Sequence, residues 1–448
     1  MNRIFLGTAL VFFVVGSIEL GSVILYRAIE HNWFSFGEAK MRRKALGINL
    51  VSNERKAQPN EVIHPYLGYV TNYADGRYFR EKNYLGNYPV SDWGFIDDKN
   101  PVWKRKPSRL LVGVLGGSVA LSTGFSSANR LKEGLRKIPK YAGKDIIIVS
   151  LANGGIKQPQ QLLTLNYLMA LGAEFDIIIN IDGFNEVALP EVDNTRFGIF
   201  YAYPRAWRER LKCLFDIRDL SRSVERRRIL KMALLRELYD LIPSISDLRF
   251  FKWSPTLNIL SLSSQHIIER NLLDTVYRSG LMREPPTFEQ SGPLSAQPKN
   301  ENLYEEIAKS WAKSSILLHR LCSANGIRYY HFLQPNQYDP RSKRLSPSEM
   351  KFAYDPTHPY RQGVIKGYPY LKRSGRTLAS RGVAFKDVSA MLKSRVDTLY
   401  EDTCCHLNGV GRDLLADTVV QFIQEREGLG SSEKMMSRMT GPSHVALP

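Results

Sequence analysis

Cysteine is scarce in this chain, with only Cys213, Cys322, Cys404 and Cys405 among 448 residues. The four form no CxxC pair, and no histidine stands at the spacing that would complete a zinc site, so a structural metal is not expected. A small scaffold held by disulfides is excluded as well. The chain also lacks the phosphate-binding pattern GxxxxGK[ST] and any internal repeat. No cofactor is therefore expected.

The composition is that of an ordinary globular protein, with 43% hydrophobic and 24% charged residues. It excludes intrinsic disorder and collagen-like repeats. The net charge of +18 invites a nucleic-acid or anionic-surface interpretation. However, the basic residues are spread through expected helices and linkers, and no recognition motif accompanies them. Nucleic acid is therefore not predicted as a partner.

The first segment is predicted to be a membrane element. Residues 4–26 are apolar apart from Glu19, and a helix of this length could cross a bilayer. A cleavable signal needs small residues before the cut, and Val15-Gly16-Ser17 matches poorly. We therefore expect an uncleaved transmembrane anchor over residues 1–30.

The orientation of this anchor stays open. Arg3 precedes the span, whereas five basic residues follow it: Arg27, Lys40, Arg42, Arg43 and Lys44. The positive-inside rule would leave the large domain in the cytoplasm. The function expected from the later motifs favours the opposite side.

The rest of the chain alternates between apolar runs and helical patterns. Short apolar runs at 109–115, 145–151 and 176–182 read as strands buried on both faces, and 129–137 and 158–171 have helical spacing. This alternation predicts a doubly wound α/β fold with a parallel sheet. The later elements are expected at 303–325 (helix), 327–333 (strand), 371–380 (helix), 383–388 (strand) and 409–425 (helix).

These elements define the expected segments of the chain. After the anchor come a strand- and turn-rich part (31–107), a first core part (108–190), a basic helical insertion (191–299), a second core part (300–427) and a flexible tail (428–448). The insertion has leucines at helical spacing, including Leu230, Leu234 and Leu235, so an apolar stripe packed on protein is favoured over membrane binding.

Three strand ends carry polar residues that could share one site, because ligands of open parallel sheets bind at the carboxyl ends of the strands. Gly116-Gly117-Ser118 follows the first run, Asn153 to Gln158 the second, and Asp182 to Glu186, which contains Asn185, the third. Taken alone, Ser118 could be a helix cap and Asn185 a turn residue. Together they offer a nucleophile and donors for an oxyanion.

A serine nucleophile needs a base and a group that orients it. Among the eight histidines, His406 stands just before the last helix and is favoured, with Asp402 as its orienter. His358 with Asp355, in a proline-rich loop, is the competing pair.

Four motifs of the chain resemble, in order, the four blocks of the SGNH, or GDSL-like, hydrolases and acyltransferases. They are GGSVA, NGG with a glutamine-rich helix after it, DGFNE, and Asp402 with CHLN. The resemblance spans residues 109–416 and implies a flavodoxin-like α/β/α sandwich. It implies Ser118 as nucleophile, His406 as base and Asp402 as orienter. The oxyanion donors would be the Ser118 N–H, a loop N–H from Gly155 or Gln158, and the Asn185 side chain.

Two positions depart from the family pattern. The aspartate usually stands three residues before the histidine, whereas Asp402 stands four before His406. The loop glycine of the second block aligns near Gln158, which leaves the choice between Gly155 and Gln158 open. The pair Asp355 and His358 has the usual spacing, and it stays in competition for that reason.

The resemblance implies an esterase or O-acyltransferase that acts on an acylated carbohydrate through an acyl-enzyme. Membrane-anchored relatives of this type often modify cell-surface polysaccharides. By this analogy the protein is expected to be single-pass in the inner membrane with a periplasmic or extracytoplasmic domain. The alternative is a non-catalytic carbohydrate-binding or polysaccharide-assembly protein that keeps the fold, which the shifted Asp402 favours.

Overall fold

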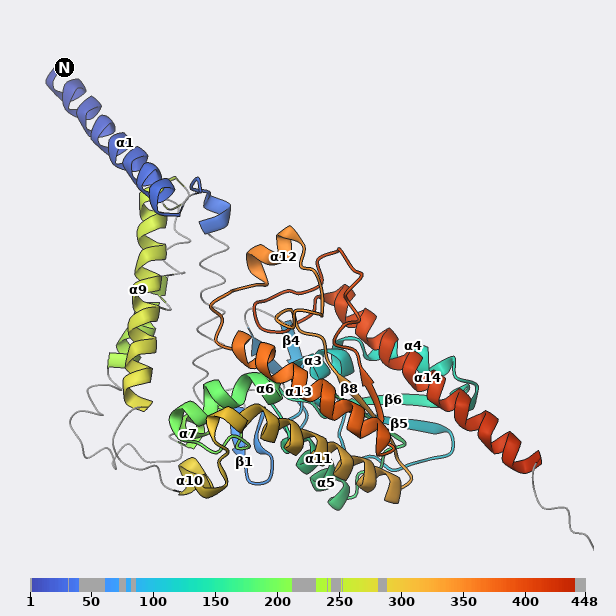
Figure 1. Cartoon of the computed structure of the whole chain (residues 1–448). Coiled ribbons are helices and arrows are strands. Elements are labelled where there is room, and N and C mark those ends of the chain that lie inside the picture. The colour runs from blue at the N-terminus through green and yellow to red at the C-terminus, as the bar shows by residue number, and fades with distance from the viewer. Residues whose placement is uncertain are drawn as a thin grey trace, which may run out of the picture. The chain divides into compact units, whose positions relative to one another are not determined.

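The computed structural model describes residues 2–30, 32–39, 61–71, 78–81, 86–211, 231–239, 241–242, 251, 253–280 and 288–439 (Figure 1). The chain divides into two compact units. One combines Met1–Lys56 with Cys213–Pro285, and the other combines Ala57–Lys212 with Pro286–Pro448. The expected insertion of 191–299 is thus divided, and its two ends belong to the second unit.

The second unit is built on a five-stranded parallel sheet. Its strands are β5 (Arg109–Gly116), β6 (Asp145–Ser150), β7 (Ile177–Asp182), β8 (Arg328–Leu333) and β9 (Ala384–Asp387). They lie in the order β6-β5-β7-β8-β9, which is the 2-1-3-4-5 order of flavodoxin-like folds. The predicted α/β class is confirmed, and the strand order reverses between β5 and β7. This switch point is where such sheets bind ligands.

Helices cover both faces of the sheet (Figure 1). On one face α4 (Ala128–Arg136) packs against α14 (Gly409–Met439), and on the other α11 (Leu303–Ala324) packs against α5 (Gln160–Ala170) and α13 (Arg361–Ser380). The central strands β5 and β7 are buried on both faces because mostly aliphatic residues fill them, as in the run from Ile177 to Ile181, whereas the edge strand β9 is partly exposed. These helices leave the carboxyl ends of the strands for the loops of the site.

Shorter elements complete this unit. The strand- and turn-rich segment forms two antiparallel hairpins, β1 (Glu61–His64) with β2 (Gly68–Thr71) and β3 (Tyr78–Glu81) with β4 (Gly86–Pro89). The remaining helices are α3 (Ser118–Leu121), α6 (Phe184–Leu189), α7 (Trp207–Leu211), α10 (Phe288–Ser291) and α12 (Pro347–Phe352). Single turns of other helix types are η1 (Ser122–Ser126), η2 (Pro139–Tyr141), η3 (Pro190–Asn194), η4 (Thr195–Phe197), η7 (Leu294–Ala296) and η8 (Asn300–Asn302).

Two helices are longer than the sequence indicated. α13 begins at Arg361 rather than near residue 371 and contains Pro369. Its first half packs closely on α6, since a Cβ on Gly363 would lie 2.4 Å from the carbonyl oxygen of Val187. α14 continues to Met439, past the point where a tail was expected from residue 428. Residues 440–448 of that tail lie outside the described residues.

The first unit contains α1 (Asn2–Glu30) and α9 (Pro255–Gly280). α1 is apolar and long enough to be a membrane anchor or a signal sequence. Its one acidic residue before the C-terminal turn, Glu19, is held by the start of α9: its carboxylate accepts hydrogen bonds from the Ser254 hydroxyl at 2.5 Å and the Thr256 N–H at 2.8 Å. This contact satisfies a charge that a lone apolar helix would leave without partners.

The leucine stripe expected in the insertion is packed only in part. Leu235 packs on Tyr239 with Met232 and Ile268. By contrast, Leu234, Leu238 and Leu241 are exposed, which corrects the expectation for these positions. Leu230 lies outside the described residues.

Candidate active site

Ser118 stands where β5 turns sharply into α3. Gly116 has a φ of +139°, and a Cβ there would lie 2.0 Å from the carbonyl oxygen of Ile181. A Cβ on Gly117 would lie 2.1 Å from Nδ2 of Asn185. The two glycines are therefore needed for the tight turn and for the close approach of the Asn185 amide to the backbone beside Ser118.

A serine, a histidine and an aspartate from distant parts of the chain form a hydrogen-bonded row. Oγ of Ser118 lies 2.7 Å from Nε2 of His406, and Nδ1 of His406 is hydrogen-bonded to Oδ2 of Asp402. When Nδ1 carries the proton, the lone pair on Nε2 can accept the Ser118 hydroxyl. Ser118 and His406 are partly exposed, so this row can be reached from solvent.

The four-residue spacing between Asp402 and His406 is accommodated by the backbone. Oδ1 of Asp402 accepts the N–H groups of Cys404, Cys405 and His406 at 2.9, 3.0 and 3.1 Å. The loop thus curls around this carboxylate while Oδ2 is left for the imidazole. The sequence departure at Asp402 therefore does not separate it from His406.

The electrostatics of this pair favour an ion pair. Burial raises the pKa of Asp402, but the His406 charge and the hydrogen bonds lower it by more, so the net pKa lies below its ordinary value. Burial lowers the pKa of His406, but the Asp402 charge and hydrogen bond outweigh it and raise the pKa to about 9. The imidazole is thus a stronger base than an ordinary histidine.

Side chains after β8 hold the loop in place. Gln337 donates to the carbonyl oxygen of Asp402 at 2.8 Å, Asn336 to that of Cys404 at 3.1 Å, and the Tyr338 hydroxyl to that of Thr403 at 2.7 Å. Asn336, Gln337 and Tyr338 were not predicted as site residues from the sequence. The sequence did carry a signal for them, because a polar run after a parallel strand lies at the same carboxyl edge of the sheet as the other site loops.

The donors expected for an oxyanion differ in availability. Nδ2 of Asn185 donates to the carbonyl oxygen of Ile156 at 2.8 Å, and its second hydrogen is left for a ligand. Gly155 has a φ of +73° and lies against the side chain of Arg205. Among the described residues, the N–H groups of Ser118 and Gly155 have no protein acceptor. They remain candidate donors.

Gln158 is removed from the candidate donors. Its N–H donates to Oε1 of Glu186 at 3.0 Å, and its amide donates to Gln161. Both groups therefore serve the framework behind the site.

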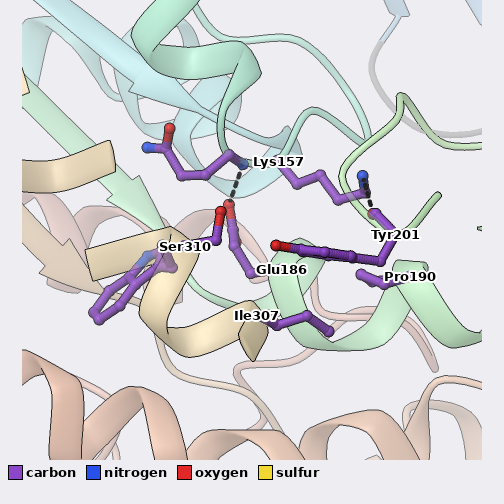
Figure 2. Close-up of a pocket in the computed structure, with 8 residues that line it drawn as sticks. Lys157, Glu186, Pro190, Tyr201, Ile307 and Ser310 are labelled. Carbon is purple, nitrogen blue, oxygen red and sulfur yellow. Dashed lines mark hydrogen bonds between the residues drawn. The ribbon is translucent and has the colours of Figure 1, made fainter. Parts of the chain in front are cut away.

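That framework surrounds a small cavity (Figure 2). Glu186 accepts the N–H groups of Gln158 and Gly183, and Lys157 donates to the carbonyl oxygens of Tyr201 and Tyr203. Burial, together with the charge of Asp182, raises the pKa of Glu186 to about 8, and burial lowers the pKa of Lys157 to about 7. At about 10 Å³ the cavity has room for one water and is too small for a substrate. The framework around it therefore braces the loops of the site.

The competing pair is not assembled. His358 is buried, and its Nδ1 accepts the N–H of Tyr360 at 3.2 Å. The Asp355 carboxylate accepts the N–H and hydroxyl of Thr357. The N–H of His358 donates to the carbonyl oxygen of Asp355 at 3.1 Å, but within the described residues no hydrogen bond joins the Asp355 carboxylate to the His358 ring, or that ring to Ser118.

A second serine–histidine–aspartate row lies inside the core. His331 is hydrogen-bonded to Oγ of Ser315 at 2.7 Å and to Oδ1 of Asp182 at 2.8 Å. Ser315 and His331 have no exposed surface, so no substrate reaches them. Solvent access, more than the residue types, distinguishes the row at Ser118.

Two thiols stand beside His406. Sγ of Cys404 and Sγ of Cys405 lie 3.4 Å apart, and both, like the described Cys322, are free. Burial raises the pKa of Cys405 well above its ordinary value. Cys213 lies outside the described residues. The two sulfurs and a His406 nitrogen all lie within 4.8 Å of one another, and they could hold a metal ion.

No protein-family model and no curated protein matches this chain.

Proposed function

We propose that this protein is a serine-dependent ester hydrolase or O-acyltransferase of the SGNH type. The observation that carries the proposal is the 2.7 Å contact between Oγ of Ser118 and Nε2 of a His406 that Asp402 orients. This is the arrangement that activates a serine hydroxyl as a nucleophile. Its position at the switch point of the sheet agrees with a ligand site.

The reaction follows from these groups. His406 takes the proton of Ser118 as Oγ attacks the ester carbonyl, and the N–H groups of Ser118 and Gly155 with the Asn185 amide stabilise the oxyanion. The intermediate collapses, the alcohol leaves with the proton from His406, and an acyl group stays on Ser118. Water or a second hydroxyl, deprotonated by His406, then takes the acyl group.

The substrate and location extend the proposal. We propose an acylated carbohydrate as substrate, with α1 as an uncleaved anchor and the α/β unit on the extracytoplasmic side of the inner membrane. The apolar length of α1 supports the anchor. The substrate and the side of the membrane follow from the resemblance to membrane-anchored relatives. A reporter fused to the C-terminus reads the side directly.

Labelling by a fluorophosphonate tests the nucleophile, because only an activated serine reacts with it. We expect the detergent-solubilised full chain to be labelled on Ser118, and Ser118→Ala to lose both the label and the hydrolysis of an activated acetyl ester. Ser122→Ala is the matched control, since the Ser122 hydroxyl only donates to Val119 within the same helical turn. Hydrolysis by Ser118→Ala at the wild-type rate would refute the proposal.

The alternative of a non-catalytic carbohydrate-binding protein loses its main support. It was favoured by the spacing of Asp402, but Asp402 reaches His406 in spite of that spacing. Retention of an acylated oligosaccharide without release of its acyl group, by a protein whose Ser118 is not labelled, would restore it.

A further inference from the structure

Cys404, Cys405 and His406 are consecutive residues, and their side chains converge instead of alternating. The two sulfurs are 3.4 Å apart, and all three potential ligand atoms lie within 4.8 Å of one another. Cys404 is partly exposed and gives the cluster a route to solvent. Two thiols and an imidazole are a ligand set that zinc and cadmium prefer.

The separations are close to those that a tetrahedral metal requires. Zinc binds sulfur at about 2.3 Å and nitrogen at about 2.0–2.1 Å, so its ligand atoms stand roughly 3.3–3.8 Å apart. A pair of these atoms at the 4.8 Å limit would need to approach by about 1.0–1.5 Å. The loop is also preformed, because one Asp402 oxygen accepts all three backbone N–H groups.

The orientation that Asp402 gives to the His406 imidazole suits metal binding as well as proton transfer. Its Oδ2 holds Nδ1 of His406, so Nε2 is the nitrogen that would bind a metal. A carboxylate behind a histidine is the usual support of a metal-binding imidazole. Nε2 is the same atom that contacts Oγ of Ser118.

We infer that Cys404, Cys405 and His406 form a site for a thiophilic divalent cation such as Zn²⁺ or Cd²⁺, and that the bound ion blocks the base. On binding, the two thiols release their protons to solvent, both sulfurs bond to the metal, and the Nε2 lone pair is occupied. Ser118 then has no acceptor for its proton. The metal binding stands on its own, whereas the inhibition rests on the proposed function.

A cadmium titration of the full chain tests the binding. The protein is purified in detergent with a phosphine reductant, stripped of metal by a chelator, and titrated with CdCl₂ while the ultraviolet charge-transfer band of cadmium thiolate is recorded. We expect one saturable site in the wild type and no band in the Cys404→Ser/Cys405→Ser double variant. Cys322→Ser, which removes a buried thiol of α11, is the matched control and keeps the band.

Two further variants separate this site from the catalytic proposal. Asp402→Asn is expected to weaken cadmium binding by about 10- to 100-fold, because the support of His406 is lost. Ser118→Ala is expected to bind cadmium like the wild type. Binding by Ser118→Ala combined with absent fluorophosphonate labelling of the wild type would support the metal site while the proposed function fails.

The inhibition is measured as the ratio of ester hydrolysis with and without ZnCl₂ for each variant, so that changes in basal rate cancel. We expect more than tenfold inhibition of the wild type, reversed by EDTA, and a ratio near one for the double variant. A wild type that gives no saturable band at tenfold molar excess of cadmium, or a double variant that keeps the band, would overturn the inference.

Discussion

Asp402 stands four residues before His406, and its two carboxylate oxygens bind different groups, one the imidazole and the other the backbone. Oδ2 holds Nδ1 of His406, and Oδ1 accepts the three N–H groups from Cys404 to His406. One residue therefore both shapes the loop and orients the His406 imidazole. Its replacement should be costly for the reaction.

Asp402→Asn keeps the size of the side chain but presents an amide that favours the wrong tautomer of His406. We expect kcat for an activated ester to fall by about 10³- to 10⁴-fold, with circular dichroism like that of the wild type. The matched control is Asp355→Asn, which alters the competing pair and should keep most of the activity. If Asp355→Asn were the inactive variant, the roles of the two pairs would be reversed.

The raised pKa of His406 predicts the pH dependence of the reaction. A general base acts when neutral, and with a pKa of about 9 most of the imidazole is protonated at neutral pH. We therefore expect kcat/KM to rise with pH through neutrality and to level off only near pH 9. The measurement is made in EDTA, so that no metal competes for Nε2. A plateau already reached at pH 7 contradicts the ion-pair picture.

The fold could be predicted because its first strands, β5, β6 and β7, are mostly aliphatic on both faces. The five parallel strands start and end within about two residues of the predicted runs. Burial on both sides leaves little freedom for other patterns in the central strands, whereas the edge strand β9 is partly exposed. The first half of α13 was not predicted, and it contains Pro369 and two glycines. Tertiary packing of Gly363 and Gly367 on Val187 outweighs their poor helix propensity.

The site was predictable to the level of residue types at strand ends, but not to that of individual hydrogen bonds. Gly155 and Gln158 lie in one loop, and only the contact of the Gln158 N–H with Glu186 distinguishes them. Likewise, the reach of Asp402 depends on the backbone curling around its carboxylate. Such choices depend on atoms that come from distant parts of the sequence.

Asn185→Ala removes a proposed oxyanion donor. We expect kcat to fall by about 10²- to 10³-fold with little change in KM, because the donor acts chiefly in the transition state. The amide also donates to Ile156, so a merely structural role would instead lower stability or raise KM. Steady-state kinetics together with a thermal melt distinguish the two outcomes.

Gly117→Ala tests the close approach of Asn185 to the serine turn. The new Cβ would lie 2.1 Å from Nδ2 of Asn185, so the amide must move and labelling of Ser118 should slow by more than tenfold. Gly428→Ala is the matched control, because a Cβ there meets nothing within 4 Å and α14 is helical. Equal labelling rates of the two variants would mean that the Asn185 position does not matter.

Glu19 tests whether α1 stays attached to the chain as an anchor. Its carboxylate accepts hydrogen bonds from Ser254 and Thr256 at the start of α9, and a cleaved signal could not keep this contact. We expect an intact N-terminus by mass spectrometry and resistance to alkaline extraction from membranes.

We also expect faster hydrogen exchange at the start of α9 in Glu19→Ala, because unsatisfied donors cost about 1–3 kcal/mol. Glu19→Gln, which keeps one acceptor, should show a smaller effect. A mature protein that begins after residue 19 would rule out the anchor.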